Sequence, residues 1–367
     1  MEVAEELPED FRCPISLEVM TDPVILSSGH TFDRHSIQLW LDSGNRTCPV
    51  TNLPLPPSPS LIPNYALRSL ISSFLAARRP PRSAAPVSTL AFLARLSFPS
   101  DAASLSSVLR LAQCGGAAGR RLVTDSGAVA VLLRHAGASD CPDLQDLSLR
   151  ALLHLSLDGD DARLGLVAEG ALDPVVAALS PDCSSSSALA STLLTSLAVV
   201  EVNKATIGAH PFAIPRLAAL LRDGDARERR EATTALYELC KFADNRRRAV
   251  RAGAVPPLVR LVREGSERAV RVLGLLAKCR EGKDEMRKTI GFVKALAEAL
   301  RAGSPRAIEH GLLALNLVCS ESKDMALEAI EEGGLQLCSL LFCDLNQKTR
   351  KNAMELALTL QNANQYS

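Results

Sequence analysis

Two cysteines and two histidines near the N-terminus are the side chains whose types could bind a metal ion. Cys13, His30, His35 and Cys48 are separated by 16, 4 and 12 residues. Structural zinc sites usually contain close ligand pairs, and here His30 and His35 form the single close pair. His35 also falls in the first turn of an expected helix. We therefore expect a module without metal or cofactor, held by core packing and polar bonds.

The elements that would position these residues follow from local signals. Residues 24–26 and 31–32 are expected strands on either side of a short turn. Asp33 is a good N-cap for a helix that continues through Leu41, and Gly44 ends that helix. The sequence therefore predicts a hairpin followed by a helix, which is a small α+β arrangement.

A second helix and a linker complete the N-terminal part. Asn64 is expected to cap the helix, whose apolar face contains Leu67, Leu70, Ile71 and Phe74. A segment rich in proline and arginine follows, and its composition favours a flexible connection. We therefore place a first domain at residues 6–78, a linker at 79–88 and a second domain at 89–363.

The second domain repeats itself about six times. In each repeat a segment ends near a glycine and an apolar helix follows, at spacings of 38–43 residues counted from Gly127. Pro174, Pro215 and Pro256 suit the first turn of these helices. A further helix, rich in leucine and small residues, follows each apolar helix, as expected where one helix packs between neighbours. The fold class is therefore mainly α.

Charge is balanced overall but not along the chain. The sequence has 41 Lys+Arg and 41 Asp+Glu, which argues against a dedicated nucleic-acid binder. Residues 222–306, however, contain 21 basic and 12 acidic residues. This block is either a solvated outer face or a docking surface for an acidic or phosphorylated partner.

The cysteines and the N-terminus indicate an intracellular protein. The ten cysteines are scattered singly, which predicts buried, reduced thiols. The acidic N-terminus lacks the pattern of a signal peptide, and the most apolar stretch, residues 188–202, is too short to span a bilayer. We expect a soluble protein without an integral membrane segment, located in the cytoplasm, the nucleus or both.

Six short motifs carry a resemblance to a known family. In order, they are Phe11–Ile15, Asp22–Val24, Ser28–Arg34, Ile37–Leu41, Cys48-Pro49 and Leu61–Arg68. Together they resemble a U-box, the metal-free relative of the RING finger found in E3 ubiquitin ligases. The later repeats resemble armadillo repeats, which stack into a right-handed superhelix, with HEAT repeats as the second choice. A U-box followed by armadillo repeats resembles the plant U-box ligase family.

The resemblance implies a docking site for a ubiquitin-conjugating enzyme (E2). By position, Ile15 lies in its first loop, Trp40 on its helix and Pro49 in its second loop. Asn52 stands where many relatives have Arg or Lys, which weakens the expected activation but not E2 binding. The mechanism requires no catalytic side chain from this chain, because the E2 carries ubiquitin as a thioester. The implied partners are the E2, ubiquitin and a substrate protein, and a dimer formed through the U-box is left open.

The resemblance implies that the armadillo half selects the substrate. The Trp and Asn ladder of nuclear import receptors is absent. The densest basic positions are the substrate-docking candidates Arg227, Arg229, Arg230, Arg246, Arg247 and Arg248. The rival to an E3 ligase is a non-catalytic armadillo scaffold with a weakened U-box. All nine lysines lie at position 204 or later, so we expect self-ubiquitination on lysine in the C-terminal half.

Overall fold

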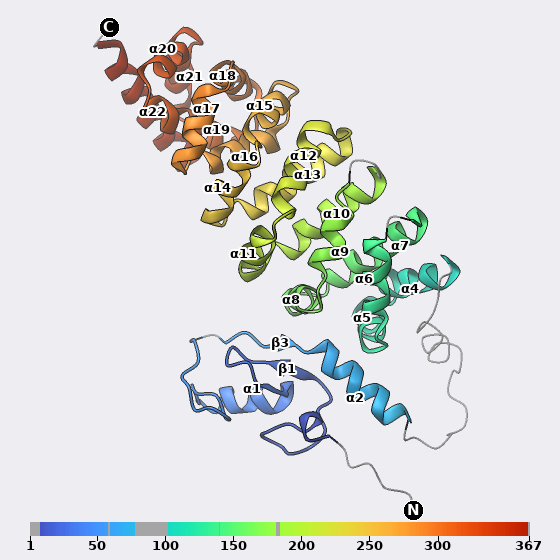
Figure 1. The fold of residues 1–367 in the computed structure, drawn as a ribbon. Helices are drawn as coiled ribbons and strands as arrows, with labels where there is room; N and C mark the ends of the chain where they lie inside the picture. Colours follow the sequence, from blue (N-terminus) through green and yellow to red (C-terminus); the bar gives the residue numbers. More distant parts are fainter. Residues whose placement is uncertain (1–7, 58, 78–101, 139, 181–183, 366–367) are drawn as a thin grey trace, which may run out of the picture. The chain divides into compact units, whose positions relative to one another are not determined.

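A computed structural model describes residues 8–57, 59–77, 102–138, 140–180 and 184–365 (Figure 1). The linker expected at 79–88 and Cys183 lie outside these residues. Contacts divide the chain into two compact units, Met1–Ala177 and Ala178–Ser367. Helices dominate both units, which confirms the mainly α fold class.

The first unit begins with the N-terminal module (residues 8–77). Its strand order is β2-β1-β3 with both pairs antiparallel, and Val24 lies opposite both Phe32 and Pro63. The predicted hairpin is therefore confirmed, and a third strand joins its other edge. The elements are the 3-10 helix η1 (Glu9–Phe11), β1 (Pro23–Ile25), β2 (Thr31–Asp33), α1 (Arg34–Asp42), β3 (Ile62–Pro63) and α2 (Tyr65–Ala77).

Both helices of the module begin at the predicted caps. The Asp33 carboxylate accepts a 3.1 Å hydrogen bond from the His35 N–H, and the Asn64 side chain accepts one of 3.1 Å from the Leu67 N–H. Gly44 follows α1 in the left-handed conformation (φ 87°), as expected for a residue that ends a helix.

The apolar face of α2 is narrower than predicted. Ile71 is buried, whereas Leu70 is 59% exposed, so the module covers only part of the predicted apolar face. Leu67, Ile71 and Phe74 are spaced four and three residues apart and share one narrow stripe. Leu70 falls at the edge of that stripe, where the small module does not cover it.

Strands, helices and loops of the module share one apolar core. The large side chains in it each contribute roughly 1.5–3 kcal/mol through burial. Two of its members are loop cysteines, so the core also fixes the loops that surround them. The buried members are Cys13, Met20, Val24, Leu26, Phe32, Ile37, Leu41, Cys48 and Ile71.

The remaining helices are a single helix, α4, and then six triplets in chain order from α5 to α22. We call the last helix of each triplet a third helix. In the first unit they are α4 (Ala102–Cys114), α5 (Gly116–Asp125), α6 (Ala128–Gly137), α7 (Pro142–Ser156), α8 (Asp160–Ala168) and α9 (Leu172–Ala177). In the second unit they are α10 (Ser184–Leu197), α11 (Glu201–Ala209), α12 (Ala213–Asp223), α13 (Ala226–Leu239), α14 (Ala243–Arg251), α15 (Val255–Arg263), α16 (Glu267–Leu276), α17 (Arg280–Lys288), α18 (Phe292–Ala302), α19 (Pro305–Cys319), α20 (Lys323–Glu331), α21 (Gly334–Leu341) and α22 (Gln347–Gln365).

The glycines and prolines that were predicted to mark the starts of helices are found there in the structure. Gly127, Gly291 and Gly333 adopt left-handed φ values of 71–79° directly before α6, α18 and α21. Proline occupies the first turn of α9, α12 and α15, as predicted.

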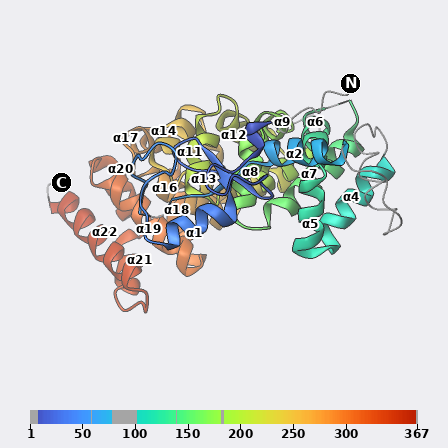
Figure 2. The same cartoon turned by 90° about the horizontal axis from the view of Figure 1, so that it is seen from below.

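The third helices of the second unit pack against one another in sequence, from α10 through α13, α16 and α19 to α22. A Cβ at Gly274 of α16 would lie 2.8 Å from the backbone oxygen of His310 on α19, so glycine permits this close approach. The helices α11, α14 and α17 likewise follow one another (Figure 2). Buried Asn245 on α14 donates to the carbonyl of Lys204 on α11 (2.8 Å) and to that of Leu239 on α13 (3.0 Å).

Not all cysteines are buried, contrary to the prediction. Cys114, Cys141 and Cys343 are exposed, because they lie at helix ends or in a connection that no neighbouring element covers. Among the described helices, none combines the length and hydropathy required to cross a bilayer.

Candidate functional site

Two turns of the N-terminal module have the same sequence pattern and the same hydrogen bonds. In Cys13–Glu18 the Cys13 N–H donates to the Glu18 carbonyl and the Leu17 N–H donates to the Cys13 carbonyl, both at 2.8 Å. In Cys48–Leu53 the equivalent bonds measure 2.9 and 2.8 Å. The fifth residue of each turn is left-handed, with φ of 61° at Leu17 and 55° at Asn52. The module therefore presents two matched, tightly closed turns.

The thiols at the start of these turns are buried hydrogen-bond acceptors. The Ser28 hydroxyl donates to the Cys48 sulfur at 3.1 Å, and the Asp33 N–H donates to the Cys13 sulfur at 3.3 Å. Burial raises the pKa of the Cys48 thiol, but hydrogen bonds from Ser28, Thr51 and Val50 outweigh it and lower the pKa to about 7. Both side chains have no exposed surface, so neither thiol is accessible from solvent.

A polar network joins the segment that follows the first turn to the start of α1. One oxygen of the Asp33 carboxylate accepts hydrogen bonds from the N–H (2.7 Å) and hydroxyl (3.1 Å) of Thr21 and from the Asp22 N–H (3.1 Å). Asp22 in turn pairs with Arg34 at 2.9 Å and with Arg68 on α2. In the part of the chain that the structure describes, no group of three or more His, Cys, Asp or Glu side chains is arranged to hold a metal.

The four predicted E2-contact residues lie on these turns and on α1. Ile15 and Trp40 are half-buried and pack against the module core. The Trp40 indole N–H donates to the Thr47 carbonyl at 2.9 Å, which ties α1 to the start of the second turn. Pro49 is half-buried and Asn52 is exposed. The structure therefore places these residues on α1 and on the two matched turns.

The two turns and α1 also expose further apolar side chains, which the sequence analysis did not identify. Leu17 (68% exposed) and Leu53 (60%) come from the two turns, Leu39 (54%) comes from α1, and Val50 is also exposed. The repeated pattern Cys-Pro-X-Ser/Thr at positions 13–16 and 48–51 was the available signal. Rigid apolar side chains exposed on tight turns favour a protein-docking surface.

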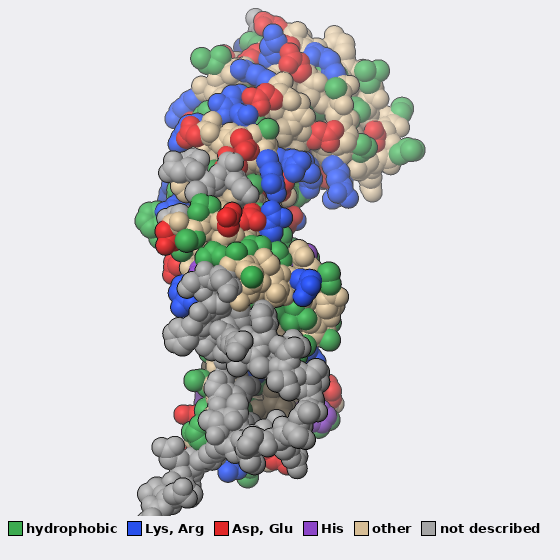
Figure 3. All heavy atoms as spheres, turned by 90° about the vertical axis from the view of Figure 1, so that its right-hand side faces the viewer, with side chains coloured by type: hydrophobic (Ala, Val, Ile, Leu, Met, Phe, Trp, Pro, Cys, Tyr) green, Lys and Arg blue, Asp and Glu red, His purple; other side chains and the backbone are tan. Residues whose placement is uncertain are grey.

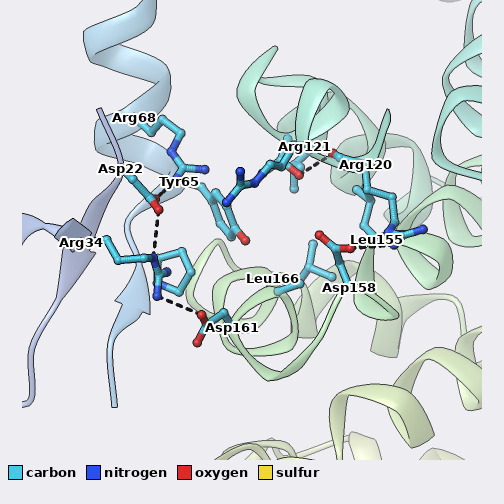
Figure 4. A pocket seen from close by; sticks show the side chains of 14 residues that line it. Asp22, Arg34, Tyr65, Arg68, Arg120, Arg121, Leu155, Asp158, Asp161 and Leu166 are labelled. Atoms are coloured by element: carbon cyan, nitrogen blue, oxygen red, sulfur yellow. Dashed lines mark hydrogen bonds and ion pairs between the residues drawn. The ribbon is translucent and has the colours of Figure 1, made fainter. Parts of the chain in front are cut away.

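A separate cavity of about 230 Å³ lies between the N-terminal module and α5, α7 and α8, inside the first unit (Figure 4). Arg34 pairs with Asp161 and Arg68 with Asp125, each at 3.0 Å, and Arg120 pairs with Asp158 at 2.7 Å. Since the basic and acidic side chains pair with each other, the cavity has no dominant sign of charge. It is suited to holding these elements together rather than to binding an ionic ligand.

Burial shifts two titrating groups near this cavity. It raises the pKa of Tyr65 to about 12, assisted by the Glu169 and Asp161 carboxylates. It also raises the pKa of Glu169 to about 7, against the opposing effect of Arg68. Both shifts follow from desolvation of the charged form.

Two of the arginines predicted to dock a substrate, Arg246 and Arg248 on α14, form hydrogen bonds within the protein. Arg246 donates to the carbonyls of Cys240 (2.9 Å) and Lys241 (3.0 Å), and Arg248 donates to the Asn245 side chain at 2.8 Å. The Arg246 guanidinium therefore stabilises the connection between α13 and α14, and Arg248 stabilises α14 itself.

The other four arginines predicted to dock a substrate differ in whether they form ion pairs. Arg230 lies 2.8 Å from Glu231, and Arg247 lies 3.9 Å from Glu281. Arg227 is exposed and Arg229 half-buried, and neither forms an ion pair among the described residues. No described contact joins the arginines of α13 to those of α14.

Comparison with known proteins matches both the N-terminal module and the later helices to described families. A U-box domain model matches residues 7–80, and the model of the plant U-box protein ARM repeat region matches residues 89–365. The chain is 50% identical to U-box domain-containing protein 8 of Arabidopsis thaliana over 98% of both chains. It is 37% identical to E3 ubiquitin-protein ligase SPL11 of Oryza sativa subsp. japonica over 42% of this chain and 24% of that protein. A designed armadillo repeat protein superposes with a TM-score of 0.55 at 20% identity, covering 63% of this chain and 99% of the design, which shows the fold.

Proposed function

Because this chain belongs to the plant U-box proteins with an armadillo repeat region, we propose that it is an E3 ubiquitin-protein ligase of the RING type. The relative SPL11 bears the name of such a ligase. In this proposal the N-terminal module binds a ubiquitin-loaded E2, and the armadillo repeats bind the protein to be modified.

The observation that carries the proposal is the pair of matched turns beside α1. They expose Leu17, Val50 and Leu53 on backbone that is closed by short hydrogen bonds. Such a surface loses little conformational entropy on docking, and a few apolar anchors then suffice for a transient complex. Trp40 supports this surface because its bond to Thr47 fixes α1 against the second turn.

The chemistry requires proximity rather than a reactive side chain from this chain. The substrate lysine amine attacks the thioester carbonyl carbon of the E2–ubiquitin conjugate. A C–N bond forms, the C–S bond breaks, the E2 cysteine leaves as a thiolate and the amine loses a proton. The proposed ligase raises the effective concentration of the amine at the thioester and restrains the conjugate. Buried Cys13 and Cys48 are consistent with transfer without a covalent intermediate on this chain.

A non-catalytic armadillo scaffold is the alternative, and Asn52 favours it. Many RING and U-box modules have Arg or Lys at this position, where the cation bonds to both E2 and ubiquitin. Asn52 is left-handed (φ 55°), a conformation that Asn tolerates better than most residues. An amide can donate a hydrogen bond there but supplies no charge.

A reconstituted reaction with E1, E2, ubiquitin and ATP separates the two functions. We expect ubiquitin chains with the wild-type protein and loss of chains in Ile15→Ala and Pro49→Ala. Arg134→Ala is the matched control, because Arg134 is exposed on α6 and belongs to neither turn. Thermal unfolding of each variant shows whether the fold is retained. Wild-type protein that is inactive with a broad panel of E2 enzymes would favour the scaffold.

A further inference from the structure

Four successive third helices each carry an exposed cationic side chain at the same position, the second residue of the helix. The second residue is Arg227 in α13, Arg268 in α16, Arg306 in α19 and Lys348 in α22. All four side chains are exposed. We call this set the basic row. Because these helices pack one against the next, the row runs across the second unit.

Most charges of the basic row are not neutralised by the protein. Arg227, Arg268 and Arg306 form no ion pair with any described residue, and Lys348 lies 3.7 Å from Glu309 with its side chain 78% exposed. Other basic residues of this unit behave differently, as Arg222 pairs with Asp223 at 3.0 Å. Figure 3 shows one face of the molecule, on which several Lys and Arg side chains lie close together with Asp and Glu side chains among them.

Two members of the row border a hollow of about 490 Å³. Its lining consists of Gly265, Ser266, Glu267, Arg268, Arg271, Ser304 and Arg306. The single acidic side chain of this lining, Glu267, is engaged by the Ser304 N–H (2.9 Å) and hydroxyl (2.6 Å). These hydrogen bonds, assisted by Arg268 and Arg271, lower the pKa of Glu267. The hollow therefore already stabilises one carboxylate, and its three arginines form no ion pair with the described residues.

An aromatic cluster lies next to the hollow. The Arg271 guanidinium lies 4.0 Å from the centre of the Tyr237 ring, the Lys241 ammonium lies 5.0 Å from it, and the His310 ring lies 6.1 Å away at an angle of 82°. The Arg271 Nε and His310 Nδ1 atoms are buried and have no hydrogen-bond partner among the described residues.

The field around this cluster is positive. Burial lowers the pKa of His310, and Arg271, Lys278 and Lys348 lower it further, while Glu309 opposes them. Cations from two third helices, α16 and α22, and from the turn that follows α16 therefore act on one site. A negatively charged group placed there would gain from all of them.

We propose that the basic row, with Arg271 and Tyr237, binds an extended acidic segment of a partner protein. The inference rests on the proposed function, because this segment would belong to the protein that is to be modified. Packed helices lie roughly 8–10 Å apart and an extended chain advances roughly 3.3 Å per residue, so one cation per repeat matches an acidic residue at about every third position. Glu309 pairs with Lys348 and so interrupts the positive charge of the row, which suits separated acidic residues better than the continuous charge of a nucleic acid.

The test uses the full chain and a fluorescein-labelled peptide of about twelve residues with Asp at about every third position in a Gly and Ser background. Fluorescence anisotropy measures its binding, and a peptide with Asn in place of Asp is the ligand control. The charge-reversal variant is Arg268→Glu with Arg306→Glu. The matched control is Lys288→Glu with Lys294→Glu, which changes the net charge equally at exposed positions on α17 and α18.

We expect the Asp peptide to bind, the Asn peptide to bind at least about tenfold more weakly, and added salt to weaken the complex. Arg268→Glu with Arg306→Glu should weaken binding about tenfold or more, whereas Lys288→Glu with Lys294→Glu should leave it within about twofold. Equal loss in both double variants would overturn the proposal, as would tighter binding of a labelled single-stranded oligonucleotide than of the Asp peptide.

Ubiquitin-chain formation in the same variants separates this inference from the proposed function. Normal chain formation without peptide binding would reject the acidic-segment site and leave the ligase intact. Peptide binding that depends on the basic row, in a protein that forms no chains with any E2, would reject the ligase and leave the docking site intact.

Discussion

The Trp40 indole nitrogen lies 2.9 Å from the Thr47 carbonyl oxygen and joins the helix of the N-terminal module to its second turn. This bond places the indole between α1 and the turn that contains Pro49 and Asn52. The half-buried ring also packs on the module core, so one side chain serves both the fold and the proposed docking surface.

Replacement of Trp40 by alanine is expected to weaken both the fold and E2 binding. The lost hydrogen bond and packing should lower the free energy of unfolding by about 2 kcal/mol, as measured by urea denaturation. Leu39→Ala, at a neighbouring but exposed position, should change stability by less than about 0.5 kcal/mol. Equal stability of Trp40→Ala and wild type would contradict the role assigned to the indole.

Replacement of Asn52 by arginine is expected to accelerate ubiquitin transfer several-fold. A guanidinium at this exposed position would supply the charge that the amide lacks. Arginine in the left-handed conformation costs roughly 1 kcal/mol, which the module should tolerate. Initial rates of chain formation provide the measurement, and Asn52→Gly provides a control that keeps the backbone conformation without a donor. A rate for Asn52→Arg at or below that of Asn52→Gly would count against this interpretation.

Replacement of Arg68 by methionine is expected to destabilise the first unit. Arg68 pairs with Asp22 and Asp125, and its side chain is only 14% exposed. Removing it would leave Asp22 with Arg34 as its ionic partner, at a cost of about 1–3 kcal/mol in unfolding free energy. Arg134→Met, at an exposed site without an ion pair in the described structure, should change stability little. Similar melting temperatures for the two variants would refute the structural role of Arg68.

The Ser28–Cys48 hydrogen bond should make stability depend on pH between 7 and 9. The pKa of Cys48 is lowered from 9.0 to about 7, so the folded state favours the thiolate. This stabilisation is fully present above pH 9 and is lost as the pH falls through 7. The stability difference between wild type and Ser28→Ala should therefore increase from pH 7 to pH 9. Urea unfolding at both pH values measures this stability difference. A difference that shrinks with rising pH would contradict the lowered pKa of Cys48.

Self-ubiquitination should be confined to exposed lysines of the C-terminal half. Lys204 is 5% exposed, so its amine should be spared. The exposed candidates are Lys241, Lys278, Lys288, Lys294, Lys323, Lys348 and Lys351. Peptide mapping of a self-ubiquitination reaction identifies the modified positions. Modification restricted to the N-terminal amine, or concentrated on Lys204, would be evidence against this expectation.

Local signals predicted most of the fold, because caps and breakers act within a few residues of themselves. Asp33, Asn64 and the glycines before the apolar helices do in the structure what their sequence neighbours suggested. The exposure of Leu70 and Cys114 was not predictable in this way, since it depends on which elements cover a face.

The candidate sites likewise combine features that the local sequence predicts with features that only tertiary packing determines. Ile15, Trp40 and Pro49 were located by motif, but the left-handed backbone at Leu17 and Asn52 emerges from the closed turns. Arg246 appeared free in the sequence, yet its guanidinium binds carbonyls that tertiary packing brings within reach. The basic row could be recognised only once the starts of the third helices were known.

Single-turnover discharge of a ubiquitin-loaded E2 onto free lysine tests the central claim most directly, because it removes substrate selection and chain elongation from the reaction. The wild-type protein should accelerate loss of the E2–ubiquitin thioester, and Ile15→Ala and Pro49→Ala should reduce the rate to that of the E2 alone while Arg134→Ala retains it. Thioester loss that is equally slow with and without the wild-type protein, across E2 enzymes that bind it, would contradict the assignment as a ligase.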